Sequence, residues 1–364
     1  MTILEARQKC PKLYLAPPNY SLYQCCSKAF MQILQEYTPD IEVYSIDESF
    51  LDMTSTINLY GEAVEVAYHI KNRIKSELGF TVNVGVSSNK LLAKMASEFE
   101  KPDRVHTLFP NEIKEKMWPL PVSELFFCGR ATTKKLSSIG INTIGDLANT
   151  DIEILKSHLK KQGEVMWSFA NGLDFSAVIS EAPKQKGYGN STTTPFDVSD
   201  LETAKKVLLA LCETVGARLR MDDFQAKVIS IGIKNFDLKY SSHQMIMKNA
   251  TNITIELYHY SCELFQQLWD GRTPIRHLAI HTSSLSSGVS GRQMDLFDVT
   301  DYVRLEKLDK TVDAIRNRYG KDVLKRAAFI QVKGTDTKLQ SIDHMEGGVS
   351  REKRSVDYSK IKVV

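Results

Sequence analysis

Two adjacent carboxylates, Asp47 and Glu48, lie in the segment YSIDESFLDMT (44–54), which is otherwise rich in apolar and aromatic residues. In a medium of low dielectric constant two such carboxylates repel each other, and each raises the pKa of the other unless a cation neutralises them. An all-oxygen pair suits Mg²⁺, which typically takes one or two carboxylates together with substrate phosphates. The alternative is a strand end whose two acids simply face solvent, which is a common arrangement.

The residues around this pair predict a β-strand with a tight turn near the two acids. Val43, Tyr44 and Phe50 are of the β-branched and aromatic types that strands favour. Successive side chains of a strand point to opposite faces, so Asp47 and Glu48 can share one ion only where the backbone turns or bulges.

Helices and strands alternate on both sides of this segment. The apolar period of residues 22–37 predicts a helix that ends before a proline, and residues 60–79 predict a second helix with Gly79 just past its end. The alternation in residues 80–86 predicts a strand, and SSNKLLAKMASEF (87–99) predicts a helix capped by its serines. This order predicts an α/β layer.

Length and composition limit the classes of protein to which the chain can belong. A chain of 364 residues is best divided into two or three domains, and 42% hydrophobic with 25% charged residues is typical of a globular protein in water. No apolar run approaches the ~18 residues of a membrane span, and no secretion signal is recognisable, so we expect a cytoplasmic protein without a membrane partner. The six cysteines form no C-x-x-C pair, which favours reduced thiols. A net charge of +3 permits nucleic-acid binding without demanding it.

The remaining chain predicts two further domains and a tail. From residue 111 short helical pieces are joined by glycines, and residues 183–197 read as a linker that leads into a strand. The later elements are predicted as a helix to about 221, strands 227–236 and about 240–247, a helix 253–269, a strand 275–283 and a helix 301–318. The tail from about 336 lacks sustained apolar periodicity.

Several motifs in the right order resemble one family. EVYSIDESFLDMT is similar to the central palm motif of the Y-family (translesion) DNA polymerases, whose pattern is Ser-Ile-Asp-Glu-Ala/Ser-Phe/Tyr-Leu-Asp. EARQKCPKLYLAPPNYSLY resembles the segment before that motif, and VNVGVSSNKLLAKMASEFEKPD resembles the Asn-Lys-x-x-Ala-Lys and Lys-Pro motifs after it. The resemblance, of the UmuC or ImpB/MucB/SamB type, runs from Thr2 to about residue 335.

The resemblance implies a multidomain fold of the α+β or α/β class. It implies a partial palm with a remnant of the fingers (1–110), a helical thumb (111–182), a little finger with an antiparallel sheet and two helices (183–335), and a mobile tail (336–364). The implied activity is that of a DNA-directed DNA polymerase, a nucleotidyltransferase that copies damaged template. Its implied partners are primer-template DNA and deoxynucleoside triphosphates, which would associate the protein with the nucleoid.

The resemblance also implies roles for individual residues. Asp47 is similar to the carboxylate that ligates both of two Mg²⁺ ions, and Glu48 to the one that binds the metal near the primer 3′-hydroxyl. Lys101 resembles the lysine that contacts the triphosphate, although a solvated lysine at a helix end is the commoner state. Asn89 and Lys90 open a helix in a geometry suited to phosphate contacts, which a plain N-cap explains equally well.

The chain also departs from the family pattern. Arg104 stands where a glycine is common, and no segment upstream of Asp47 matches the strand with a further metal-binding Asp, the paired aromatics, or the Tyr and Arg that grip the triphosphate. Met1 aligns with a methionine that is normally internal. We therefore expect an N-terminally truncated polymerase that is inactive or weak alone, and the alternative is a non-catalytic remnant that binds DNA and a sliding clamp.

Two regions predict contacts with DNA. LFFCGRATTKKLSSIGINTIGDLANT (125–150) predicts two short helices about a glycine hairpin and resembles the helix-hairpin-helix thumb, in which amides near Gly129 and Gly140 would hold phosphates. An ordinary corner between two helices is the alternative, and Phe127-Cys128-Gly129 departs from the usual Gly-Ile/Val-Gly. The strand GYGNSTTT would offer Lys186, Thr192 and Thr193 to phosphates.

A last motif lies in the Ser- and Gly-rich loop 286–298. Apolar residues exposed on a loop suggest a partner, and Gln293, Met294, Leu296 and Phe297 resemble the pentapeptide that binds the bacterial sliding clamp. The alternative is a loop that folds its Leu-Phe pair back onto its own domain.

Overall fold

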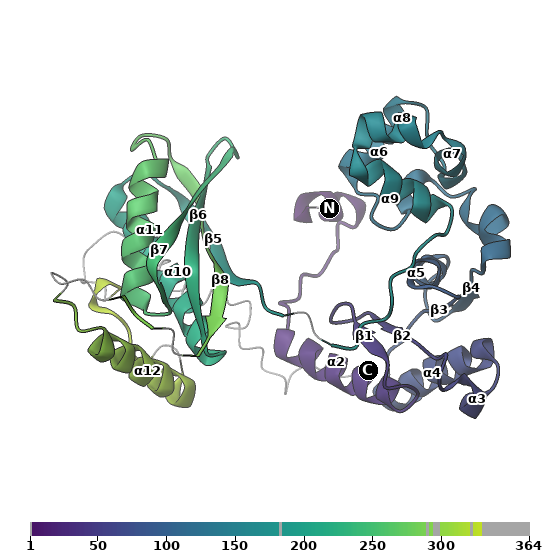
Figure 1. Ribbon diagram of the computed structural model, residues 1–364, viewed down its shortest axis with the longest axis horizontal. Helices are drawn as coiled ribbons and strands as arrows, with labels where there is room; N and C mark the ends of the chain where they lie inside the picture. The colour runs from purple at the N-terminus through teal and green to yellow at the C-terminus, as the bar shows by residue number, and fades with distance from the viewer. Residues whose placement is uncertain (1, 182–183, 289–290, 294–298, 321–322, 330–364) are drawn as a thin grey trace. The chain divides into compact units, whose positions relative to one another are not determined.

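A computed structural model describes residues 2–181, 184–288, 291–293, 299–320 and 323–329 of the chain. The chain divides into two compact units (Figure 1). One unit comprises residues 19–183, and the other comprises residues 1–18 together with 184–364. Each unit is described below by itself.

The unit formed by residues 19–183 begins with two long helices packed on a short hairpin. Helices α2 (Tyr20–Gln35) and α4 (Ala63–Leu78) share a core with strands β1 (Ile41–Val43) and β2 (Ser49–Leu51), which pair antiparallel. Both helices were predicted from their apolar period, and both predictions are confirmed. Gly79 follows α4 with φ 76°, the left-handed conformation that the predicted helix end requires. A short helix α3 (Ile57–Tyr60) links the hairpin to α4.

A second pair of strands flanks helix α5 (Lys90–Glu98). Strands β3 (Val84–Val86) and β4 (Val105–Thr107) are parallel, and α5 is the crossover between them. The predicted serine cap of this helix is wrong, because the side-chain oxygen of Asn89 accepts the hydrogen bond from the amide of Leu92 at 2.8 Å. The hydroxyl of Ser87 instead donates to the carbonyl of Leu108 at 2.5 Å, beside the neighbouring strand.

The rest of this unit is helical. Helices α6 (Arg130–Ser138), α7 (Ile144–Asn149), α8 (Ile152–Leu159) and α9 (Lys161–Ala170) follow single helical turns within residues 110–124. One continuous core joins them to α5, and its fully buried members include Leu92, Leu136, Ile144 and Leu155. Because this core crosses residue 110, the helical region packs directly against α5, and the domain boundary near 110 stays a prediction.

The second unit is built on a four-stranded antiparallel sheet in the order β5-β8-β6-β7. Its strands are β5 (Gly187–Val198), β6 (Phe224–Asn235), β7 (Tyr240–Thr251) and β8 (Ile275–Ser287). Helices α10 (Leu201–Met221) and α11 (Thr254–Leu268) lie side by side and bury their apolar faces against the sheet (Figure 1). The antiparallel sheet with two helices that we expected is therefore confirmed.

Two more helices belong to this unit, α1 (Ile3–Lys9) and α12 (Tyr302–Tyr319). Ion pairs attach α12 to α10: Arg220 contacts Asp309 at 3.1 Å and Asp313 at 2.6 Å. Asp309 is the buried residue of α12. Within the part of the chain that the structure describes, no helix is both long and apolar enough to cross a membrane.

Candidate active site and nucleic-acid surfaces

The acidic pair lies in the turn that joins β1 to β2. The amides of Tyr44 and Ser45 both donate to the carbonyl of Glu48, at 3.0 and 3.1 Å, so the backbone reverses between them. The turn that we predicted near the pair is present, and Asp47 and Glu48 lie in it. Asp47 is exposed, and its carboxylate accepts a hydrogen bond from the hydroxyl of Ser45 at 2.6 Å. This geometry frees both carboxylates from the strand alternation that would have separated them.

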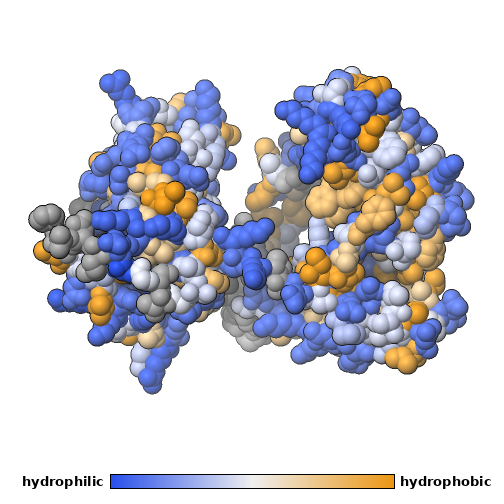
Figure 2. All heavy atoms as spheres, viewed as in Figure 1, coloured by the Kyte–Doolittle hydropathy of each residue, from blue (hydrophilic) through white to orange (hydrophobic). Residues whose placement is uncertain are grey.

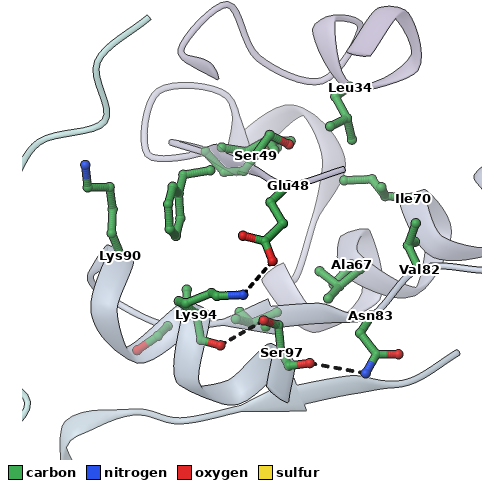
Figure 3. Close-up of a pocket in the computed structure, with 18 of the residues that line it drawn as sticks. Leu34, Glu48, Ser49, Ala67, Ile70, Val82, Asn83, Lys90, Lys94 and Ser97 are labelled. Atoms are coloured by element: carbon green, nitrogen blue, oxygen red, sulfur yellow. Dashed lines mark hydrogen bonds and ion pairs between the residues drawn. The ribbon is translucent and has the colours of Figure 1, made fainter. Parts of the chain in front are cut away.

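Lys94, on α5, holds Glu48 in place (Figure 3). Its ammonium lies 2.8 Å from a carboxylate oxygen of Glu48 and 2.8 Å from one of Glu98. Burial lowers the pKa of Lys94, but hydrogen bonds to the two carboxylates outweigh it and leave this pKa raised. Lys94 is therefore positively charged at neutral pH, and it supplies the cation that adjacent carboxylates need. No local pattern of the sequence points to this role of Lys94, because its contact with Glu48 spans 46 positions of the chain.

The pair stands at the edge of a cleft of about 1200 Å³. Every residue of 46–54 and of 80–90 lines it, and apolar side chains of α2 and α4 such as Leu34 and Ile70 form its floor (Figure 3). Neighbouring side chains of a strand point to opposite faces of the sheet, so a cleft that lay against one face would be lined by every second residue. Because consecutive residues of β2 and β3 line this cleft, we infer that the backbone edges of both strands face it. In the described parts of the chain, β2 pairs with β1 alone and β3 with β4 alone.

Lys101 extends the row of charges along the same cleft. Its ammonium lies 2.7 Å from Glu98, and its side chain is 53% exposed. Burial raises the pKa of Glu98, but its hydrogen bonds to Lys101 and Lys94 outweigh this and lower it. Arg104, the departure from the family glycine, pairs with Glu100 at 3.3 Å. Negative and positive charges thus alternate along the cleft in the order Glu48, Lys94, Glu98 and Lys101. The sequence shows the close spacing of the last three, but it does not show that Glu48 joins them.

The structure places Asn89 and Lys90 in contacts within the protein. Besides capping α5, Asn89 donates from its side-chain amide to the carbonyl of Gly172 at 3.0 Å. The ammonium of Lys90 lies 2.7 Å from Glu42 and 5.5 Å from the centre of the Phe50 ring. Glu42 also accepts a hydrogen bond from the amide of Ile179 at 2.9 Å. These residues therefore fix the segment after α9 beside the cleft, and their DNA contacts stay a prediction.

The glycine hairpin between α6 and α7 has the expected local form. Thr143 caps α7: its hydroxyl accepts from the amide of Asp146 while the Asp146 carboxylate accepts from the amide of Thr143, and the two form a capping box. Gly140 has φ 84°. Gly129 and Gly140 are exposed, and an added Cβ at either would meet no atom within 4 Å. Their amides donate within the chain, that of Gly129 to the carbonyl of Phe127 at 3.2 Å and that of Gly140 to the carbonyl of Ser137 at 3.1 Å. Phosphate binding at this hairpin therefore stays a prediction.

The turn before α6 differs from a glycine hairpin. Phe127 has φ 66°, a backbone conformation that bulky residues rarely adopt, and its ring is 60% exposed. The ring lies 4.3 Å from that of Phe126. Other large apolar side chains of this unit are also exposed, among them Ile46 and Phe175, and Figure 2 shows hydrophobic surface on this unit.

One face of the antiparallel sheet is free of α10 and α11. Cross-strand partners on this face include Thr193, His277 and Lys234, and the hydroxyl of Thr193 lies 3.1 Å from Nδ1 of His277. Thr192 points the other way and is only 3% exposed, so its side chain cannot reach a ligand on this face. Lys186 is exposed just before β5.

Of the predicted clamp-binding residues, the structure describes Gln293, whose side chain is exposed. Met294, Leu296 and Phe297 lie outside the described residues. In the described ranges, no cluster of three or more His, Cys, Asp or Glu side chains gathers as a metal site. Among the carboxylates that line the cleft, Asp47 and Glu48 are the adjacent pair, and such a pair suits Mg²⁺ bound together with substrate phosphates.

Comparison with known proteins gives consistent matches along the chain. A family model described as "impB/mucB/samB family" matches residues 1–98, and one for the C-terminal domain of that family matches residues 185–296. A model described as "DNA polymerase-iota, thumb domain" matches residues 128–174.

Individual relatives match over most of their length. A protein named DNA polymerase IV from Clostridium acetobutylicum is 44% identical over 330 residues, which cover 91% of this chain and 83% of the relative. DNA polymerase IV from Acetivibrio thermocellus is 39% identical, with 92% and 84% covered. A solved Y-family DNA polymerase chimera superposes with a TM-score of 0.67 at 24% identity, covering 79% of this chain and 83% of that chain, and so supports the fold.

Proposed function

The chain belongs to the impB/mucB/samB family of Y-family DNA polymerases, and we propose that it copies damaged template DNA by metal-dependent transfer of nucleotides to a primer end. The observation that carries this proposal is the Asp47–Glu48 pair, which lines a cleft of about 1200 Å³ within the segment that matches the family. A polymerase acting on chromosomal DNA would work in the cytoplasm, with the nucleoid.

Four charged residues that line the cleft have roles in this proposal. Asp47 and Glu48 would hold Mg²⁺, which would supply a lowered pKa for a primer hydroxyl and neutralisation of developing negative charge. Before a metal binds, Lys94 neutralises Glu48 at 2.8 Å and keeps it at the mouth of the cleft. Lys101, which is half exposed, would contact the triphosphate.

We further propose that an extended segment seated in the cleft completes the active site. The free edges of β2 and β3 face the cleft, so a strand between them would gain backbone hydrogen bonds on both sides. In the family such a strand carries a further metal-binding carboxylate. Two carboxylates hold Mg²⁺ less firmly than a fuller ligand set, so we expect primer extension by the chain alone to be weak.

Primer extension with Mg²⁺ on undamaged and lesion-containing templates tests these proposals. Asp47→Ala should abolish extension, whereas Asp40→Ala, an exposed carboxylate just before β1, should leave it unchanged. Adding the N-terminal segment of the Clostridium acetobutylicum relative as a separate polypeptide should raise the rate. Extension that survives Asp47→Ala would exclude the acidic pair as the catalytic centre.

The second candidate function is a non-catalytic one, binding of DNA and of a sliding clamp. It is favoured by the pairing of Glu48 with Lys94, which already satisfies one of the two carboxylates. Failure to extend primers with or without the added segment, together with retained DNA binding, would support this function over polymerisation.

We propose two DNA-binding surfaces, one in each unit. The exposed turns at Gly129 and Gly140 would approach phosphates in one unit. In the other unit, Lys186 just before β5 and Thr193 on the free face of the sheet would bind them. Lys186→Ala should weaken binding to all sequences and reduce its salt dependence, because a lysine contact to phosphate releases about one counterion. Fluorescence anisotropy with a labelled primer-template at several salt concentrations measures both effects.

We also propose that residues 293–297 bind the bacterial sliding clamp. The supporting observation is that Gln293 is exposed in a loop, next to apolar residues of the motif. Substituting Gln293 by Ala should lower the affinity for the purified clamp, measured by surface plasmon resonance.

A further inference from the structure

Two rings on the free face of the antiparallel sheet lie over glycines. At Gly232 of β6 an added Cβ would lie 2.0 Å from the hydroxyl oxygen of Tyr240, and at Gly189 of β5 it would lie 3.0 Å from Cδ2 of His281. At Gly187, the next residue of β5 on this face, it would lie 2.9 Å from Cε1 of the same imidazole. The two rings therefore occupy the space that side chains would fill at these three positions.

Both rings stay open to solvent on their outer side. Tyr240 is 56% exposed and His281 is also exposed, whereas Gly232 beneath Tyr240 is buried. The neighbours of His281 along β8, Ile280 and Thr282, are at most 1% exposed, because they point into the core on the other face. The rings are thus held against the backbone of the sheet and present aromatic surface on the side away from α10 and α11.

The three glycines beneath the rings are unfavourable residues for a strand, because glycine loses more conformational freedom on folding than other residues and has no side chain to pack. A glycine inside a strand often marks a place where a ligand approaches the backbone closely. Here each glycine is covered by a ring that is itself exposed. This arrangement keeps the aromatic surface low against the sheet, where an extended ligand can lie across it.

The side chains around the rings suit a polyanion. At the register positions of this face, from Gly187 to Thr193 on β5 and at their partners on β8, β6 and β7, none of the residues is Asp or Glu. A hydroxyl or amide group, or an ammonium, is instead available at Ser191, Thr193, Ser230, Lys234, Ser242 and Gln244. Such groups donate hydrogen bonds to backbone phosphates, and the missing carboxylates would have repelled them.

The spacing of the rings favours unpaired bases over a duplex. His281 covers β5 and Tyr240 covers β6, and β8 lies between these two strands. From the register, and with ~4.8 Å between strands and ~3.4 Å per residue, Gly189 and Gly232 lie roughly 12 Å apart. The bases of a duplex stack on one another about 3.4 Å apart, so their faces are already covered. Unpaired bases of an extended strand can reach both rings.

We propose that this face of the sheet binds an unpaired segment of DNA, with one base stacked on Tyr240 and another on His281. Lys234 and the hydroxyl groups beside the rings bind the phosphates of the same segment. This inference rests on the proposed DNA binding of this unit and assigns unpaired DNA to the free face. Every base has a face that can stack on a ring, so the binding tolerates any sequence.

Fluorescence anisotropy of a labelled oligothymidylate with the full chain tests the proposal. Tyr240→Leu should weaken binding about tenfold, because it removes one stacking ring, whereas Tyr240→Phe keeps the ring and should bind like the wild type. His281→Leu, on another strand, should cause a similar loss and repeats the test where removal of the Tyr240 ring unfolds the sheet. Tyr319→Leu is the matched control, since Tyr319 is 62% exposed on α12, and it should change nothing.

A strand of abasic sites and a blunt duplex separate stacking from phosphate binding. Both should bind the wild type and Tyr240→Leu equally, because neither offers an unpaired base to the rings. If Tyr240→Leu left the affinity for oligothymidylate unchanged, or weakened the abasic strand as much, stacking would be overturned while DNA binding by this unit stands. Loss of affinity in Tyr240→Phe as large as in Tyr240→Leu would overturn it as well. If the chain binds neither single strands nor duplex, the proposed DNA binding itself fails, and the stacking role fails with it.

Discussion

Replacing Gly85 by alanine should disrupt the contact between β3 and α5. A Cβ atom at Gly85 would lie 1.9 Å from the carbonyl oxygen of Ala93 and 2.7 Å from the amide nitrogen of Ser97. Both are backbone atoms of α5, so no side-chain rotation can relieve the overlap. Restoring an ordinary contact distance of 3.4 Å requires the helix to move by about 1.5 Å.

The cost of this movement follows from what α5 buries. Leu91, Leu92 and Met95 are each at most 2% exposed, so shifting the helix disturbs a close-packed core, and we expect a loss of about 3 kcal/mol in the free energy of unfolding. The same shift would draw Lys94 away from Glu48, which lies 2.8 Å from it. Displacements of about 1 Å can cost ~100-fold in rate, so primer extension should fall by a similar factor.

Urea unfolding followed by tryptophan fluorescence measures the stability change. A Trp269→Phe background leaves Trp118 and Trp167 as reporters, both in the unit of residues 19–183. Gly129→Ala is the control, since an added Cβ there meets no atom within 4 Å and φ is −75°. If Gly85→Ala and Gly129→Ala unfolded at the same urea concentration, the argument from close approach would be refuted.

Three further outcomes are expected. Arg220→Met should lower the stability of its unit by about 3 kcal/mol in thermal unfolding, because buried Asp309 loses its nearest guanidinium and keeps only Arg326, at 3.7 Å; adding Asp309→Leu should recover part of the loss. Burial lowers the pKa of His277, so the stability that its neutral form contributes is present above pH 6.5 and is lost as the pH falls through the lowered pKa. His277→Gln should therefore make the melting temperature depend less on pH between pH 7.5 and 5.5. Burial raises the pKa of the Cys212 thiol to about 12, so maleimide at pH 8 should label exposed Cys10 within minutes and Cys212 only after unfolding, as followed by mass spectrometry.

The regular elements were largely predictable because burial imposes a period on the sequence. Helix α4 and its end at Gly79 followed from apolar spacing and from the glycine that a left-handed residue requires. The capping box of Thr143 and Asp146 is local in the same way, since both partners lie within one helical turn. Both features depend on residues that are close together in the chain, so the sequence alone was enough to predict them.

The cap of α5 shows where such reasoning stops. Ser87, Ser88 and Asn89 are all good capping residues, so propensity alone could not choose among them. The choice depended on Leu108, whose carbonyl accepts the hydroxyl of Ser87 from across the parallel strand pair. A contact between residues far apart in the chain therefore decided which residue was left to cap the helix.

The sequence by itself determined the family, the order of the elements and the presence of two adjacent acids near a turn, because ordered motifs and local periodicity are written along the chain. Only the tertiary structure decided how those acids are held. It brought Lys94 to Glu48 across 46 positions of sequence, turned the edges of β2 and β3 toward one cleft, and faced Thr193 outward while burying Thr192. Such pairings depend on how α5 and the strands pack, which no local pattern specifies.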